Sequence, residues 1–197
     1  MSETSPSRST ELPRKVGLGI ALASAALRWF NPAYWDFLDD LDLAIHEAGH
    51  VIFQPFGEPM LTLGGSLFQV IVPLAFVLYF IRSGQRFAAW FTLVWVGINL
   101  LNVAIYVGDA RAQELPLLGG ENTVHDWWYL LTEWDLLEQH AALAFTLRLA
   151  AALTFLTALG GGLTALRVSP AGPYPAPPSP SRRPDGKAED SRRSGAA

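Results

Sequence analysis

Three long apolar blocks dominate the hydrophobic pattern of the chain. Residues 60–81 and 87–107 contain no charged side chain, and residues 141–166 contain only Arg148. Each block can cross a hydrocarbon core, which takes about 20 helical residues. The pattern predicts an all-α, polytopic membrane helix bundle with about four spanning helices, at 36–56, 60–81, 87–108 and 141–166. A fifth span is expected if residues 16–30 cross the membrane instead of lying at its surface as an amphipathic helix.

Composition narrows the class of protein. Half of the 197 residues are hydrophobic and 16% are charged, whereas globular domains average about 25% charged residues. This deficit argues against a soluble enzyme, a nucleic-acid binder and a coiled coil. The chain has no cysteine, which excludes disulfides and thiolate metal ligands. We therefore expect the lipid bilayer as a partner, no nucleic acid, and a multi-pass location in a bacterial cell membrane.

Charge is distributed unevenly along the chain. Residues 31–140 hold thirteen acidic and three basic side chains, and basic residues predominate on both sides of this region. Because basic loops tend to stay in the cytoplasm, we expect the loop with Arg82 and Arg86 to lie inside, together with both termini. The acidic connection 108–140 should then face outward. The Pro- and Arg-rich tail 168–197 has too few large apolar side chains to fold and is predicted to be disordered.

The acidic connection contains one amphipathic segment. Thr123 and Asp126 have the spacing of a capping box at a helix start. Apolar residues then recur at helical spacing: Trp127, Leu130, Leu131, Trp134 and Leu137. Such a helix suits the membrane–water interface. It is interpreted as an interfacial anchor, and the alternative is a lid over a site at that surface.

Candidate chemistry lies in the sequence His46-Glu47-Ala48-Gly49-His50. On a helix, two histidines four residues apart lie on the same side, one turn apart. They can bind Zn²⁺ at about 2.0–2.1 Å, and the intervening glutamate can act as general base towards a zinc-bound water. We therefore predict a zinc site with His46 and His50 as ligands and Glu47 as the catalytic residue. Ionisable side chains in a membrane segment are costly unless they have such a function.

A catalytic zinc ion needs a third protein ligand. Asp109 is the first candidate, because it ends a polar stripe on an otherwise apolar helix, formed by Asn99, Asn102, Tyr106 and Asp109. This stripe should face the bundle interior. His125 is the main alternative, and Asp126 and His140 are further candidates. Asn99 and Asn102 either form hydrogen bonds between helices or contact the substrate and a developing oxyanion.

Residues 36–110 resemble the three-helix catalytic core of the site-2 protease family of intramembrane zinc metallopeptidases. The resemblance is carried by the HEAGH helix, a Gly-bearing segment (Gly64-Gly65-Ser66), and a third helix with asparagines and a distal aspartate. It implies that His46, His50 and Asp109 bind zinc and that Glu47 is the catalytic base. It also implies that the Gly-bearing segment presents the substrate in extended form.

These observations predict a membrane-embedded zinc metalloprotease that hydrolyses peptide bonds of membrane-associated proteins. The alternative is a zinc-binding membrane protein without peptidase activity, acting as a sensor, a partner protein or a hydrolase of a non-peptide substrate. The predicted parts of the chain are an N-terminal segment with a short apolar helix (1–35), the metallopeptidase-like core (36–110), an acidic Trp-rich interfacial loop (111–140), the last transmembrane helix (141–167) and the tail (168–197).

Overall fold

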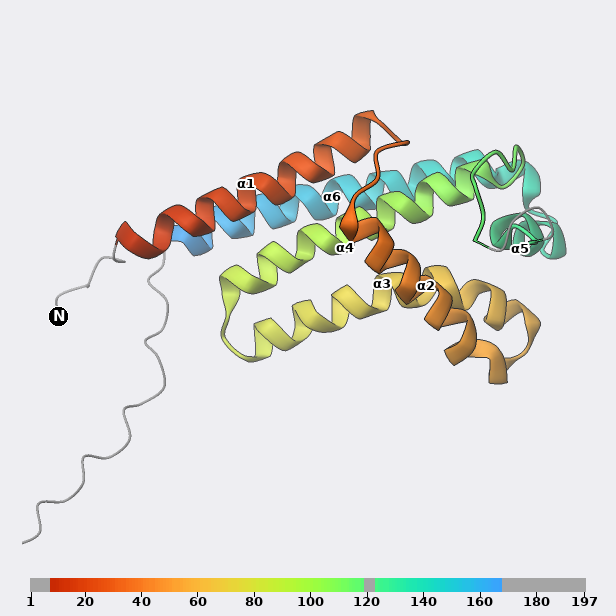
Figure 1. Cartoon of the computed structure of the whole chain (residues 1–197), viewed down its shortest axis with the longest axis horizontal. Helices are drawn as coiled ribbons and strands as arrows, with labels where there is room; N and C mark the ends of the chain where they lie inside the picture. The colour runs from red at the N-terminus through yellow and green to blue at the C-terminus, as the bar shows by residue number, and fades with distance from the viewer. Residues whose placement is uncertain (1–7, 119–122, 168–197) are drawn as a thin grey trace, which may run out of the picture.

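The computed structural model describes residues 8–118 and 123–167, and within these ranges the chain consists of helices and turns without any β-strand (Figure 1). The elements are α1 (Arg8–Phe30), α2 (Phe37–Phe53), the 3₁₀ turn η1 (Gln54–Phe56), α3 (Glu58–Arg82), α4 (Arg86–Asp109), α5 (Asp126–Glu133), the 3₁₀ turn η3 (Leu137–Gln139) and α6 (His140–Arg167). The all-α prediction is confirmed for this part of the chain. The tail predicted to be disordered lies outside the described residues.

Three helical segments are long and apolar enough to cross a membrane: Glu58–Arg82, Arg86–Asp109 and Leu137–Arg167. They are consistent with an integral membrane protein. The fourth span predicted over 36–56 is not among them. Its helix, α2, is only 17 residues long and has Asp39 and Asp40 in its first turn. Helix α1, which covers the segment 16–30, is not among them either.

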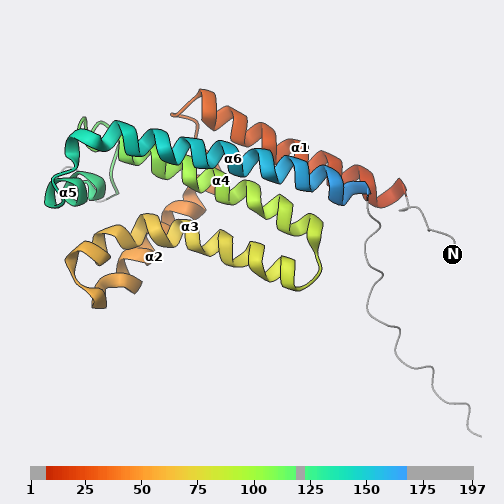
Figure 2. The ribbon, with the colours of Figure 1, turned by 180° about the vertical axis from the view of Figure 1, so that it is seen from behind.

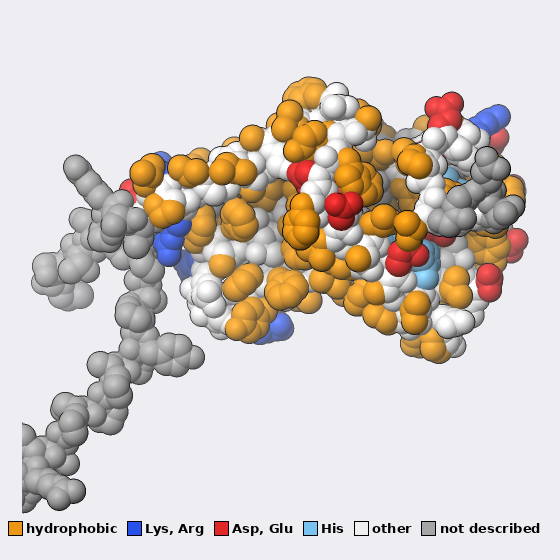
Figure 3. All heavy atoms as spheres, viewed as in Figure 1, with side chains coloured by type: hydrophobic (Ala, Val, Ile, Leu, Met, Phe, Trp, Pro, Cys, Tyr) orange, Lys and Arg blue, Asp and Glu red, His pale blue; other side chains and the backbone are white. Residues whose placement is uncertain are grey.

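Helix α4 lies at the centre of the bundle, where it packs against α6, α3 and α1. Helix α2 packs on α3. The start of α1, the turn between α3 and α4, and the end of α6 lie at one end of the molecule, whereas α5 and the turn between α2 and α3 lie at the other end (Figures 1 and 2). Most of the visible basic side chains lie towards the first end, whereas acidic side chains lie over the middle of the molecule and, together with histidine, at the second end (Figure 3). This distribution agrees with the acidic middle region of the sequence.

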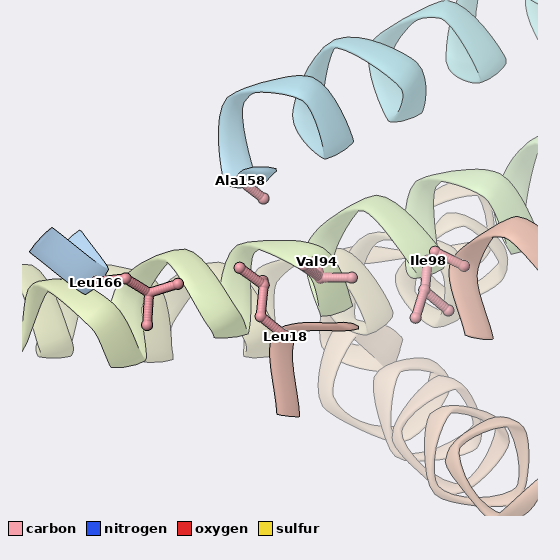
Figure 4. Close-up of a cluster of buried hydrophobic side chains, with 6 residues drawn as sticks. Leu18, Val94, Ile98, Ala158 and Leu166 are labelled. Atoms are coloured by element: carbon pink, nitrogen blue, oxygen red, sulfur yellow. The ribbon is translucent and has the colours of Figure 1, made fainter. Parts of the chain in front are cut away.

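Two apolar clusters connect these helices. The first joins α1, α4 and α6 through Leu18, Ala25, Val94, Ile98, Ala158 and Leu166 (Figure 4). The second joins the end of α4 to α5 and α6 through Val103, Val107, Ala110, Leu131 and Ala144. Leu130 and Leu131 of α5 are completely buried. The apolar face predicted for the segment after Thr123 therefore anchors α5 to the bundle.

Glycines set the distance between α2 and α3. A Cβ atom added to Gly64 would lie 2.7 Å from the Gly49 carbonyl oxygen, and one added to Gly49 would overlap the Gly64 carbonyl. The two backbones are therefore in direct contact at this crossing. Small residues allow such close approach of helices in membranes. As a result, the histidine-bearing turn of α2 is pressed against α3.

A buried ion-pair network fixes the start of α2 to α1. The Arg28 side chain of α1 is 1% exposed and donates to Asp36 and Asp39, both at 2.7 Å. Asp36 and Asp39 also form the capping box of α2, in which each side chain accepts a backbone N–H. Each carboxylate thus stabilises both the helix start and the buried guanidinium.

Candidate metal centre

Helix α2 brings His46 and His50 together as the sequence predicted, with ring centroids 4.8 Å apart. The third member of the group is Asp126, the first residue of α5. Its Oδ2 atom lies 3.1 Å from His46 Nε2 and 3.4 Å from His50 Nε2. The three side chains each offer one ligand atom, and these atoms all lie within 4.8 Å of one another. Two imidazoles and a carboxylate are a ligand set that zinc accepts.

The Nδ1 atoms of both imidazoles face away from Asp126 and towards oxygen acceptors. His46 Nδ1 lies 3.1 Å from Gln69 Oε1, and His50 Nδ1 lies 2.9 Å from the Leu61 carbonyl oxygen. Both acceptors belong to α3. With these acceptors each Nδ1 can donate a proton to α3, so that Nε2 is the atom that donates to Asp126 when it is protonated and that can bind a metal ion when it is not. Metal-ligating histidines are commonly oriented by such a hydrogen bond from the second ring nitrogen.

The charges of His50 and Asp126 strongly influence each other's pKa. The hydrogen bond to Asp126 is the largest influence on His50 and raises the pKa of that imidazole to about 9, although burial acts in the opposite direction. Burial by itself would raise the pKa of the Asp126 carboxyl. Hydrogen bonds with His46 and His50 outweigh burial and hold this pKa below its usual value. A negative oxygen is thus fixed between two imidazoles and attracts a positive charge, either a proton or a metal ion.

Gly65 of α3 forms the wall behind the two imidazoles. A Cβ atom at this position would lie 2.5 Å from His46 Nε2 and 2.7 Å from His50 Nε2. No other residue type fits without displacing the rings. The Gly-bearing segment noted in the sequence therefore contacts the histidines through Gly65. Its neighbour Ser66 accepts a hydrogen bond from Trp127 Nε1 of α5 at 3.0 Å, so α5 is attached across this part of α3.

Glu47 lies next to the two histidines and is partly buried. Its negative charge contributes to the raised pKa of His50, which places the carboxylate within electrostatic reach of the group. This position is compatible with the role of general base that the motif predicts for Glu47.

Asp109 is not part of the three-residue group. Its two carboxylate oxygens accept the backbone N–H groups of Glu114 and Leu115, each at 3.0 Å. His125 faces Asp109, with Nε2 3.4 Å from Oδ2. Asp109 therefore holds the loop after α4 and contacts the residue that precedes Asp126. His140 lies elsewhere and places its Nδ1 2.9 Å from the Leu137 carbonyl oxygen.

His125 is completely buried and caps α5. Its Nδ1 accepts the backbone N–H of Trp128 at 3.2 Å. The helix start predicted at Thr123 is thus displaced, because the imidazole replaces the predicted threonine cap and α5 begins at Asp126. This displacement matters for the site. The Asp126 side chain is released from the capping box predicted by the sequence and reaches the two histidines instead.

The polar stripe of α4 has a polar partner at each position. Asn99 is completely buried and donates to the Trp95 carbonyl, and Asn102 donates to Asp39 at 3.1 Å. Tyr106 Oη accepts the backbone N–H of Asp126 at 3.1 Å. The stripe thus faces the interior as predicted. The hydrogen bond of Asn102 to Asp39 joins α4 to α2, which favours the interhelical interpretation for Asn102. The hydrogen bond of Asn99 to the Trp95 carbonyl stays within α4.

Two supports of the histidines were not assigned to the site from the sequence. The backbone carbonyl of Leu61 could not be identified from the sequence, because any residue at this position has the same group. Gln69 does have a signal, since a lone amide in a 22-residue uncharged block is expected to face a polar partner inside a bundle. Gln69 lies one helical turn beyond Gly65 on α3, and this position could have indicated that its polar partner is one of the histidines.

Comparison with known proteins gives no match: no family model, no curated protein and no solved structure is similar to this chain. The resemblance to the site-2 protease family therefore continues to depend on the sequence motif.

Proposed function

We propose that the chain is a membrane-embedded zinc metalloprotease in which His46, His50 and Asp126 bind the metal. This assignment moves the third ligand from Asp109 to Asp126. One observation carries it: both Nε2 atoms and the Asp126 carboxylate converge, while both Nδ1 atoms are engaged by acceptors on α3. Three ligand atoms directed at one point, with their outer hydrogen bonds in place, form the arrangement expected around zinc.

A zinc ion bound there would supply Lewis-acid activation of a water molecule and of a carbonyl oxygen. Glu47 accepts the proton that the attacking water loses and returns it to the leaving amine nitrogen as the C–N bond breaks. In this proposal Asn99 and Asn102 position helices and do not stabilise the oxyanion.

The proposed substrate is a peptide bond of a membrane-associated protein. The histidine group is supported by Gln69 of α3 and Tyr106 of α4, and both helices are apolar enough to span a bilayer. Tyr106 lies near the end of α4 that adjoins α5, and Gln69 lies near the middle of α3. A substrate segment near the membrane surface would reach this end of the bundle first.

The test combines metal analysis with one catalytic variant. Detergent-purified wild-type protein should contain one zinc per chain, and the His46→Ala and Asp126→Ala variants should contain much less. Glu47→Gln should retain the full zinc content and lose hydrolysis of membrane-tethered peptide substrates, because Glu47 is not a ligand. Full hydrolysis by Glu47→Gln would contradict the protease mechanism, and unchanged zinc content in His46→Ala would contradict the metal site.

The second candidate is a zinc-binding membrane protein without peptidase activity. The limited solvent access of the site favours this second candidate, since the side chains of His46 and Asp126 are only 10% and 16% exposed. Zinc bound with equal affinity by wild type and Glu47→Gln, with no hydrolysis by either, would support this candidate.

A further inference from the structure

A second buried polar cluster lies between α2 and α4, separate from the histidine group. We call Asp42, Trp95 and Asn99 the Asp42 cluster. Asp42 is 1% exposed and Asn99 is completely buried. Asp42 Oδ1 accepts a hydrogen bond from Trp95 Nε1 at 2.7 Å. Nothing in the proposed hydrolysis uses these three side chains.

Two oxygen atoms of the Asp42 cluster have no hydrogen-bond donor. They are Asp42 Oδ2 and Asn99 Oδ1, and both are fully shielded from solvent. The Asn99 amide lies next to the Asp42 carboxyl, while its Nδ2 donates to the Trp95 carbonyl at 3.1 Å. A buried acceptor without a donor costs about 1–3 kcal/mol, and more when it is charged. One proton on Asp42 would turn one of these two acceptors into a donor for the other.

The charged groups around Asp42 do not supply such a donor. Hydrogen bonds from Trp95 and Asn99 and the charge of Arg28 lower the pKa of Asp42, whereas the charge of Asp39 raises it. Arg28 itself donates to Asp36 and Asp39 and not to Asp42. Helix α4 contributes only the neutral Trp95 and Asn99, and α3 has no ionisable residue between Glu58 and Tyr79. Burial is the largest influence and raises the pKa of Asp42 to about 7.

We propose that Asp42 is a buried proton-binding site whose Oδ2–H donates to Asn99 Oδ1. A proton is favoured over a metal ion, because hard cations need about six oxygen ligands and only two oxygens are unpaired here. One proton converts Oδ2 from an acceptor into a donor and satisfies both atoms together.

The site connects pH to the helix that carries the histidines. Asp39, Asp42, His46 and Gly49 form the buried face of α2, so Asp42 lies one turn before His46. Ionisation of Asp42 places an uncompensated charge between α2 and α4. Because the folded-state pKa is raised above the unfolded value of about 3.9, the folded state binds the proton more tightly. Folding stability therefore falls as pH rises from about 4 to about 7, and then levels off.

Asp42→Asn is the decisive variant, since an amide mimics the protonated acid and carries a permanent donor for Asn99 Oδ1. Asp39→Asn is the matched control, because Asp39 is an equally buried acid that is paired with Arg28. Thermal unfolding in detergent is followed by tryptophan fluorescence from about pH 5 to about pH 9. Relative to Asp42→Asn, the unfolding equilibrium constant of wild type should increase about tenfold per pH unit up to about pH 7. Asp39→Asn should be destabilised across the whole range.

Infrared spectroscopy gives a readout that does not depend on stability. Wild type should show the carbonyl band of a protonated buried carboxyl at low pH, which disappears near pH 7, is absent from Asp42→Asn and shifts in Asn99→Ala. The proposal is overturned if wild type shows no such band, or if Asp42→Asn is destabilised at high pH as much as Asp39→Asn. Stabilisation of wild type by sodium but not by choline would overturn it in favour of a metal cation.

Discussion

Gly65→Ala adds a single methyl group at the point where α3 contacts both imidazoles. The new Cβ would lie 2.5 Å from His46 Nε2 and 2.7 Å from His50 Nε2, whereas ordinary contacts begin at 3.4 Å. The two nitrogen atoms must therefore move by about 0.9 and about 0.7 Å. Zinc–ligand distances tolerate only about 0.2 Å. Both displacements exceed this tolerance several-fold.

We expect Gly65→Ala to lower zinc affinity at least about 100-fold, because disturbed ligand orientation costs about 10- to 100-fold and two ligands are disturbed together. This loss corresponds to about 2.7 kcal/mol. The assay is competition with a chromophoric zinc chelator in detergent, with circular dichroism as the check on helix content. Gly160→Ala is the matched control, since Gly160 lies in α6 with no atom within 4 Å of an added Cβ, and its zinc affinity should equal that of wild type.

Zinc affinity within threefold of wild type in a folded Gly65→Ala protein would refute the reasoning. It would mean either that the metal does not bind at these Nε2 atoms or that α3 is farther from α2 than described. An equal loss of affinity in Gly160→Ala would instead indicate a general effect of alanine in these helices.

Three further predictions concern the surroundings of the site. Asp126→Ala should reduce zinc affinity more than Asp109→Ala in the chelator competition assay, because Asp109 acts indirectly, by holding the loop after α4 and by contacting His125. The reverse order would restore Asp109 as the ligand. Apparent zinc affinity should rise about tenfold per pH unit up to about pH 9, which is the pKa of metal-free His50. The reason is that zinc must displace the proton that His50 shares with Asp126. A plateau of the affinity that begins near pH 7 would contradict this coupling. Arg28→Met should lower the free energy of unfolding by about 3–5 kcal/mol in detergent denaturation, since it leaves the buried Asp39 carboxylate without its cation. An effect below about 1 kcal/mol, the usual size for a solvent-exposed ion pair, would show that solvent reaches the network.

Local rules predicted the helices and the histidine pair. An uncharged apolar block of more than 20 residues has few alternatives to a helix in a membrane, and α3 and α4 match the predicted blocks closely. A spacing of four residues fixes His46 and His50 on one side of any helix. The interior orientation of the α4 stripe followed from the same periodicity.

The third member of the group could not be predicted in this way. Asp109 directly follows the second apolar block and Asp126 lies in the acidic connection after it, and the sequence gives no distance between either acid and the histidines. The choice depends on how α5 packs: Leu130 and Leu131 are buried against the bundle, and His125 rather than Thr123 caps the helix. Asp126 is thereby directed inward, while Asp109 is held by backbone N–H groups.

The sequence alone determined a helical, membrane-type chain with an acidic middle region and a two-histidine turn, because each of these features depends on neighbouring residues. The tertiary structure decided which side chains meet that turn. Contact of the α2 and α3 backbones at Gly49 and Gly64, and the packing of α5 against α4 and α6, bring together residues up to 80 positions apart. Such contacts are set by shape and packing among whole helices, which local spacing does not encode.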